Sequence, residues 1–131
     1  MKRHPELVGL SREHQRALQL SLEAKRAVQS DDTEKMQTLI DDCVHAFKLE
    51  FEPHFQVEES ALLPKLQAAG ETALVKRALE DHAKLRELAE KLPSWEAEDI
   101  MAFSECMIAH VRFEERVLFP RYEMLFLNVK P

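Results

Sequence analysis

Glycine, cysteine and aromatic residues are all scarce in this chain. It contains two glycines, two cysteines and 7% aromatic residues, whereas 45% of its residues are hydrophobic and 32% are charged. Scarce glycine together with abundant leucine, alanine, glutamate and lysine favours an all-helical protein. The cysteines, Cys43 and Cys106, are too few and too far apart for a disulfide framework or a Cys-x-x-Cys metal site.

The sequence also lacks a basic run and a long apolar stretch. Its formal net charge of -6 argues against nucleic acid as the main partner. No apolar stretch approaches the roughly 20 residues that span a bilayer, so no membrane partner is expected. Residues 1–6 open with positive charge, but no apolar segment follows, which argues against a secretory signal. We therefore expect a single cytoplasmic domain over residues 1–131.

Apolar residues recur at spacings of three and four along four segments, which predicts four amphipathic helices. The segments are residues 7–28, 36–62, 71–92 and 100–120. On the last of them the inward stripe is expected to include Val117. Short polar connections between helices of similar length predict an all-α, up-down-up-down antiparallel four-helix bundle. The tail, residues 121–131, is expected to form a short helical turn packed on the bundle.

Prolines and capping residues predict where these helices bend and end. Pro53 removes a backbone donor inside the second helix, so we expect a kink or a local break there. Pro64 and Gly70 are expected to end that helix. Ser94, followed by acidic residues, is expected to cap the fourth helix.

An eleven-residue pattern occurs twice: residues 54–64, HFQVEESALLP, return as residues 110–120, HVRFEERVLFP. In both copies a histidine is followed four residues later by a glutamate, which places the two side chains on one helix face. A neutral imidazole and a carboxylate that converge on one point suit a first-row transition metal such as iron or manganese. Two copies indicate two metal ions, or one site of pseudo-twofold symmetry.

The inward stripes carry six polar residues that a hydrophobic core rarely holds. A buried, charged glutamate is costly unless it is paired or binds a metal. A single inward histidine is more often a hydrogen-bonded core residue than a ligand, and an isolated His-x-x-x-Glu is common. The combination favours a metal site, for which the predicted ligands are His14, His54, Glu58, His82, His110 and Glu114.

Other polar residues lie out of phase with these stripes. His45 is about half a turn away from His54 and is expected at the surface, as is the terminal His4. Glu59 and Glu115 lie five residues after the repeat histidines. Their side chains are therefore expected to face solvent or to contact the ligands rather than the metal. The cysteines and phenylalanines are expected to pack as core residues.

The order of these motifs resembles that of the hemerythrin-like, or HHE cation-binding, family of four-helix bundles. The family pattern is a lone histidine, a His-x-x-x-Glu, a second lone histidine and a second His-x-x-x-Glu, and here it extends over residues 7–120. The resemblance implies a non-haem centre of two iron ions between the helices. It implies four histidines as terminal ligands, Glu58 and Glu114 as bridges between the irons, an additional oxo or hydroxo bridge and an open position.

Two positions depart from the oxygen-carrying hemerythrins. Those proteins have a fifth histidine where this chain has Arg86, and an aspartate where it has Glu115. A reversible oxygen carrier is therefore disfavoured. The ligand set is more similar to that of the repair-of-iron-centres proteins and of iron-sensing members. The former carry a cysteine-bearing N-terminal region that this sequence does not contain, so the resemblance does not extend to their repair activity. Arg86 either brings positive charge near bound oxygen or a carboxylate, or points to solvent.

The sequence favours one function for this site, keeps one alternative and disfavours a third. The first is a di-iron protein that reacts with or senses oxygen, peroxide or nitric oxide. The alternative is an iron-storage, iron-delivery or iron-responsive module without catalytic turnover. A ferritin-like oxidase is disfavoured because the inner face carries no Glu-x-x-His motif. The sequence leaves open iron against manganese or zinc, the diatomic ligand, turnover and the oligomeric state.

Overall fold

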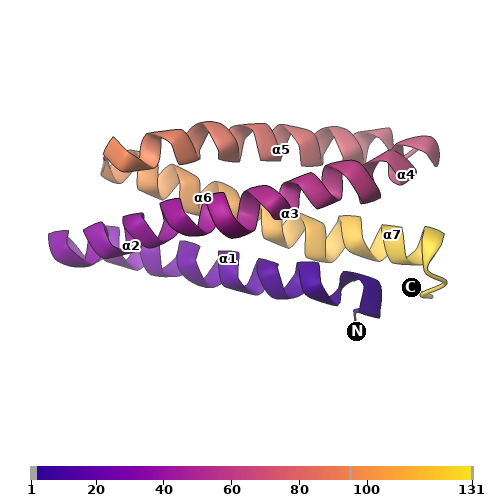
Figure 1. Cartoon of the computed structure of the whole chain (residues 1–131), viewed down its shortest axis with the longest axis horizontal. Helices are drawn as coiled ribbons and strands as arrows, with labels where there is room; N and C mark the ends of the chain where they lie inside the picture. Colours follow the sequence, from indigo (N-terminus) through magenta and orange to yellow (C-terminus); the bar gives the residue numbers. More distant parts are fainter. Residues whose placement is uncertain (1–2, 95, 131) are drawn as a thin grey trace.

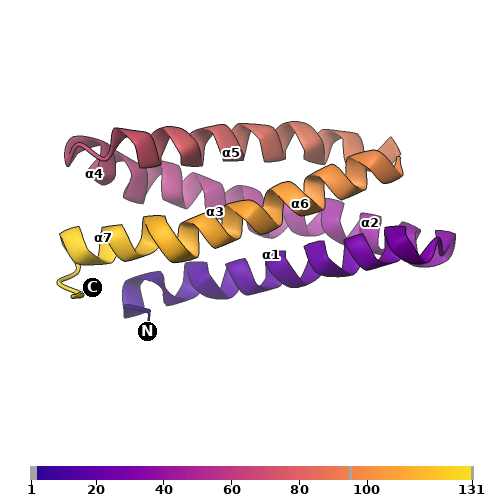
Figure 2. The same ribbon diagram turned by 180° about the vertical axis from the view of Figure 1, so that it is seen from behind.

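The computed structural model describes residues 3–94 and 96–130, and all regular secondary structure in these residues is helical. Four helical rods, each made of one helix or of several consecutive helical elements, lie alongside one another and alternate in direction (Figure 1). The first and last described residues consequently lie at the same end of the bundle. The view from behind shows the first rod next to the fourth (Figure 2). The predicted up-down-up-down four-helix bundle is confirmed.

The first rod is helix α1 (Pro5–Ser30). His4 caps its start, because the ring nitrogen Nδ1 accepts a hydrogen bond from a backbone N–H of the first turn. His4 is half-buried at the surface rather than fully exposed. The chain reverses through Asp31, whose φ of 58° is left-handed. Asp32 then caps α2 (Thr33–Ala46) by accepting a hydrogen bond from a backbone N–H of that helix.

The second rod is continuous from the start of α2 to the end of α4. After α2 it comprises η1 (Phe47–Phe51), α3 (Glu52–Val57), η2 (Glu58–Leu62) and α4 (Leu63–Ala68). The rod continues through Pro53, where the expected local disturbance takes the form of the π-helical turn η1 just before it. Pro64 does not end the rod, so that expectation is corrected. The rod ends before Gly70, whose φ of +88° suits a residue without a Cβ atom.

Pro53, Pro64 and Pro120 each follow a π-helical turn, which explains why the second and fourth rods continue. A proline in an α-helix would leave a carbonyl unpaired and press its ring against the preceding turn. A turn closed by a hydrogen bond from residue i+5 to residue i is wider and accommodates the ring. The residue before each proline makes such a bond: Glu52 N–H to Phe47 C=O, Leu63 N–H to Glu58 C=O, and Phe119 N–H to Glu114 C=O.

The third rod is α5 (Thr72–Lys91), which ends in a short 3-10 turn, η3 (Leu92–Ser94). The Ser94 hydroxyl donates a hydrogen bond to the carbonyl of Lys91. Ser94 therefore closes the third rod, and its predicted role as the cap of the fourth helix is wrong. The predicted acidic first turn is present, because Glu98 and Asp99 lie there.

The fourth rod comprises α6 (Ala97–Phe113), η4 (Glu114–Leu118) and α7 (Phe119–Phe126). The wide turn η4 shifts the inward stripe by one residue, so Leu118 is fully buried and Val117 is 45% exposed. The expected inward position of Val117 is therefore wrong. The predicted helical tail is present as α7, which continues the rod without a break.

Two hydrophobic clusters fill the bundle on either side of a polar layer. One cluster, which includes Phe47 and Phe103, lies toward the end remote from the termini. The other, which includes Leu7 and Phe119, lies toward the termini. Burial of one such large side chain stabilises the fold by about 1.5–3 kcal/mol. None of the helices in the described part of the chain combines the length and hydrophobicity needed to span a bilayer.

Candidate metal centre

The polar layer between the clusters consists of the six predicted ligands. Each rod contributes one histidine, and the second and fourth rods each add one glutamate. Every one of these residues is buried, and none is more than 4% exposed. The helix periodicity explains the placement, because each residue lies on the stripe that its helix turns toward the core. The layer contains His14, His54, Glu58, His82, His110 and Glu114.

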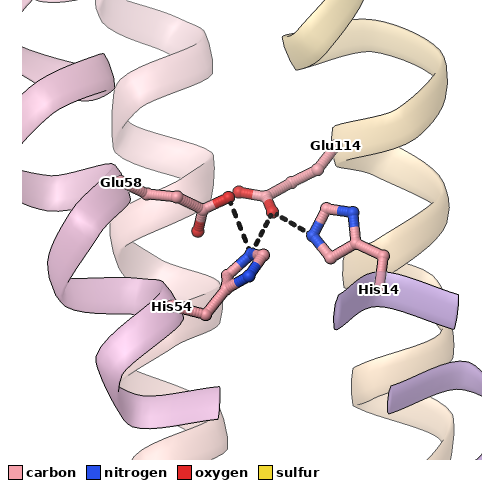
Figure 3. A group of neighbouring side chains, drawn as sticks. All are labelled: His14, His54, Glu58 and Glu114. Carbon is pink, nitrogen blue, oxygen red and sulfur yellow. Dashed lines mark hydrogen bonds and ion pairs between the residues drawn. The ribbon is translucent and has the colours of Figure 1, made fainter. Parts of the chain in front are cut away.

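His14 and His54 form one group with the two glutamates, and its ligand atoms lie within 4.8 Å of one another. Nε2 of His14 lies 2.8 Å from Oε1 of Glu114. Nε2 of His54 lies 3.1 Å from Oε2 of Glu58 and 3.8 Å from Oε1 of Glu114. Figure 3 shows the four side chains pointing toward one another, His54 and Glu58 from the second rod, His14 from the first and Glu114 from the fourth.

His82 and His110 form a second group with the same two glutamates, again with ligand atoms within 4.8 Å of one another. Nε2 of His82 lies 3.0 Å from Oε1 of Glu58, and Nε2 of His110 lies 3.3 Å from Oε1 of Glu114. The second group is thus related to the first by an approximate twofold arrangement. Two overlapping groups that share both carboxylates are the arrangement expected of a binuclear metal site.

Four inward-facing atoms of the layer have no hydrogen-bond partner among the described residues: Oε1 of Glu58, Oε2 of Glu114 and Nε2 of His82 and His110. Nε2 of His82 lies 3.0 Å from Oε1 of Glu58, which is close enough for a hydrogen bond, but the two groups are not oriented to form one. An unpaired buried polar atom costs about 1–3 kcal/mol. Imidazole nitrogens and carboxylate oxygens suit first-row metal ions. The donor set therefore fits such ions.

A family model confirms the resemblance inferred from the sequence. The model of the Hemerythrin HHE cation binding domain matches residues 7–122, which include all six residues of the polar layer. The chain belongs to this family. No curated protein and no solved structure gives a significant match to it. The buried histidines and glutamates thus form, within an HHE cation binding domain, two groups that could hold a metal ion.

The HHE domain also supports each histidine from outside the layer. Every Nδ1 atom faces a carboxylate: His14 faces Glu115 at 2.6 Å, His54 faces Glu13 at 3.2 Å, His82 faces Glu59 at 2.7 Å, and His110 faces Asp81 at 2.8 Å. With the proton on Nδ1, the Nε2 lone pair is directed into the layer. Such carboxylate–histidine pairs orient metal ligands and increase their basicity.

Two of these four carboxylates were predicted and two were missed. Glu59 and Glu115 are half-buried and contact ligands, which is one of the two positions expected for them. Glu13 and Asp81 had no predicted role. The available signal was that an acidic residue precedes each lone histidine in the sequence. Their partners lie on neighbouring helices, however, and the periodicity of a single helix does not predict contacts between helices.

Close packing of charged groups shifts several pKa values in the HHE domain. Burial and the neighbouring Glu114 raise the pKa of Glu58 well above its usual value. Burial alone would lower the pKa of His82 and His110, but the nearby carboxylates of Glu114, Glu58 and Asp81 raise both to about 9. Without metal, these two histidines therefore carry protons at neutral pH. A metal ion must displace those protons when it binds.

The remaining titratable candidates lie outside the polar layer. His45 is exposed, as predicted. Cys43 packs in the hydrophobic cluster remote from the termini, and burial raises the pKa of its thiol to about 11. Burial also raises the pKa of Cys106, which packs against the same cluster. Both cysteines thus behave as small core residues, as expected, and neither belongs to the metal-ligand groups found in the described residues.

Proposed function

We propose that this HHE domain binds two iron ions and reacts with or senses a small diatomic ligand or oxidant: oxygen, peroxide or nitric oxide. The observation that carries the proposal is the pair of overlapping His₂Glu₂ groups, which share both carboxylates and contain buried atoms without hydrogen-bond partners. Iron is preferred over zinc or manganese because the family resemblance implies a non-haem di-iron centre. Iron and the small ligand are the proposed partners.

The proposed ligands divide between the two ions according to the observed groups. His14 and His54 would hold one iron, and His82 and His110 would hold the other. The glutamates belong to both groups and would bridge the ions. Two ferrous ions would supply the electrons with which a bound diatomic ligand is reduced.

The protein's own contribution is orientation and exclusion of water. The outer carboxylates fix the rings so that the Nε2 atoms face the ions. Phe55 stacks on His82 and Phe119 stacks on His14, with ring centroids 4.1 and 5.1 Å apart. These rings and the two hydrophobic clusters shield the layer from solvent. The deep burial of the layer favours small ligands over bulky organic substrates.

The proposal is tested by adding each candidate ligand to reduced, iron-loaded protein under anaerobic conditions. We expect oxygen, peroxide or nitric oxide to change the visible and electron paramagnetic resonance spectra within the mixing time. Protein reloaded with redox-inert zinc is the matched control and should remain unchanged. If none of the three ligands alters the iron spectra, the proposed reaction is wrong.

The second candidate function is iron storage, delivery or iron-responsive folding without turnover. It is favoured by the four buried atoms that lack partners, because a fold with such a layer depends on metal for its stability. Repeated cycles of reduction and ligand addition separate the two functions. A stoichiometric product in every cycle supports the first function, whereas iron release without product supports the second. Residence in the cytoplasm stays a prediction, for which cell fractionation is the test.

A further inference from the structure

Arg86 lies one helical turn after His82 and binds two carboxylates. Its Nη1 and Nη2 atoms donate hydrogen bonds of 3.0 and 3.1 Å to Glu59. Its Nε and Nη2 atoms donate hydrogen bonds of 2.7 Å each to Glu52. Glu59 is the carboxylate that holds Nδ1 of His82 at 2.7 Å. The guanidinium and the imidazole therefore compete for the negative charge of one carboxylate.

Arg3 occupies the equivalent position behind His14. Its Nη2 atom donates a hydrogen bond of 3.1 Å to Glu115, and its Nη1 atom donates one of 2.6 Å to the buried Glu123. Glu115 in turn holds Nδ1 of His14 at 2.6 Å. The chain Arg3–Glu115–His14 thus repeats the chain Arg86–Glu59–His82, although the two arginines lie at unrelated places in the sequence.

Aromatic packing reproduces the same relationship. The guanidinium carbon of Arg86 lies 5.6 Å from the ring centre of Phe55, which stacks on His82. The guanidinium carbon of Arg3 lies 5.6 Å from the ring centre of Phe119, which stacks on His14. Each lone histidine is therefore held between a carboxylate and an aromatic ring that both contact the same arginine.

The other two histidines have different surroundings. Glu13, which holds His54, is 40% exposed. Asp81, which holds His110, accepts a longer hydrogen bond of 3.4 Å from Nε of Arg77, whose guanidinium carbon lies 4.4 Å from the ring centre of Phe113 and whose side chain is 50% exposed. Neither contact resembles the paired hydrogen bonds that Arg86 makes to Glu59. The shorter and less exposed contacts of Arg86 and Arg3 thus distinguish His82 and His14 from the other two histidines.

We propose that Arg86 and Arg3 are positioning residues that raise the reduction potential of the iron pair by partly neutralising the carboxylates that hold His82 and His14. The proposal rests on the di-iron function proposed above. A carboxylate that accepts the Nδ1 proton increases electron donation from the ring to the metal. An arginine on that carboxylate reduces the donation, and its positive charge also disfavours the ferric ion. Both effects favour ferrous iron.

The test is the reduction potential of the full-length, iron-loaded protein in which Arg86→Gln removes the charge. We expect loss of one positive charge to favour the ferric form by about tenfold over the ferrous form, which lowers the potential by about 59 mV for one electron. Arg86→Lys keeps a positive charge and should shift the potential less. Arg16→Gln is the matched control, because Arg16 pairs with the surface carboxylate Glu50 at 3.2 Å. The reduction potential of the Arg16→Gln protein should stay at the wild-type value.

An unchanged potential in folded, fully loaded Arg86→Gln protein would overturn the proposal, as would an equal shift in Arg16→Gln. If Arg86→Gln does not fold, Arg3→Gln supplies the same test and must show a comparable fall. The iron content of the wild-type protein separates failure of the di-iron function from failure of the arginine role. Two irons with no shift in the variants refute the arginine role alone, whereas fewer than two irons in the wild type refute the di-iron function and this role with it.

Discussion

Removal of the metal ions should destabilise the domain strongly, because the polar layer contains buried atoms that have no other partner. Four such atoms are present among the described residues. At about 1–3 kcal/mol each, their combined cost is about 4–12 kcal/mol. Protons on His82 and His110 recover part of this cost in the metal-free protein, since both rings then donate to carboxylates. We therefore expect metal to contribute about 4 kcal/mol of stability, toward the lower end of that range, which is comparable to the whole stability of a small domain.

Thermal unfolding followed by circular dichroism measures this contribution. For a domain of this size, about 4 kcal/mol corresponds to a rise in Tm of roughly 12–20 °C on metal loading. Free metal must be held at a fixed excess, because stabilisation by a ligand depends on its concentration. His45→Ala is the matched control and should gain as much from metal as the wild type, because His45 is exposed. A metal-dependent rise below about 2 °C in the wild type would show that the layer satisfies itself without metal.

Three further predictions concern individual residues. Glu58→Ala and His110→Ala should each reduce bound iron sharply, whereas His45→Ala should leave it unchanged; equal losses in all three variants would refute the assignment of the inward face. Asp81→Ala should weaken iron binding about 10–100-fold in a chelator competition, because Asp81 orients His110; wild-type affinity would mean that packing alone fixes the ring. Metal affinity should rise with pH up to about 9, because His82 and His110 release protons only near that pH. Since these pKa values lie above the unfolded value of 6.5, the metal-free domain should lose stability as the pH rises from 6.5 to about 9. A metal affinity that levels off near pH 6.5 would contradict the raised pKa values.

The sequence predicted the inward face of each helix well, because burial follows the helical period. The six residues of the polar layer lie on stripes that need no knowledge of tertiary contacts, and the structure brings all six together. The exposure of His45 follows from the same period. The sharing of Glu58 and Glu114 between two groups was expected only from the family resemblance, and the structure places both glutamates in both groups.

The errors concern features that the α-helical period does not describe. Pro53 and Pro64 predicted interruptions, but π-helical turns accommodate both rings. The same kind of turn moved Val117 to the surface. Glu13 and Asp81 support histidines on neighbouring helices, so their roles depend on the lateral packing of rods rather than on spacing within one rod. The sequence alone left open whether Arg86 brings positive charge near bound oxygen or a carboxylate, or points to solvent. The fold shows that it contacts Glu52 and Glu59.

The metal content of the purified protein tests the central claim most directly. Protein made in iron-replete cells should contain about two irons per chain, because the two groups offer two sets of ligands. Its visible spectrum should show charge-transfer bands in the near ultraviolet that are lost on reduction. A single zinc ion and a featureless spectrum would contradict the account and would mean that the buried histidines and glutamates serve the structure alone.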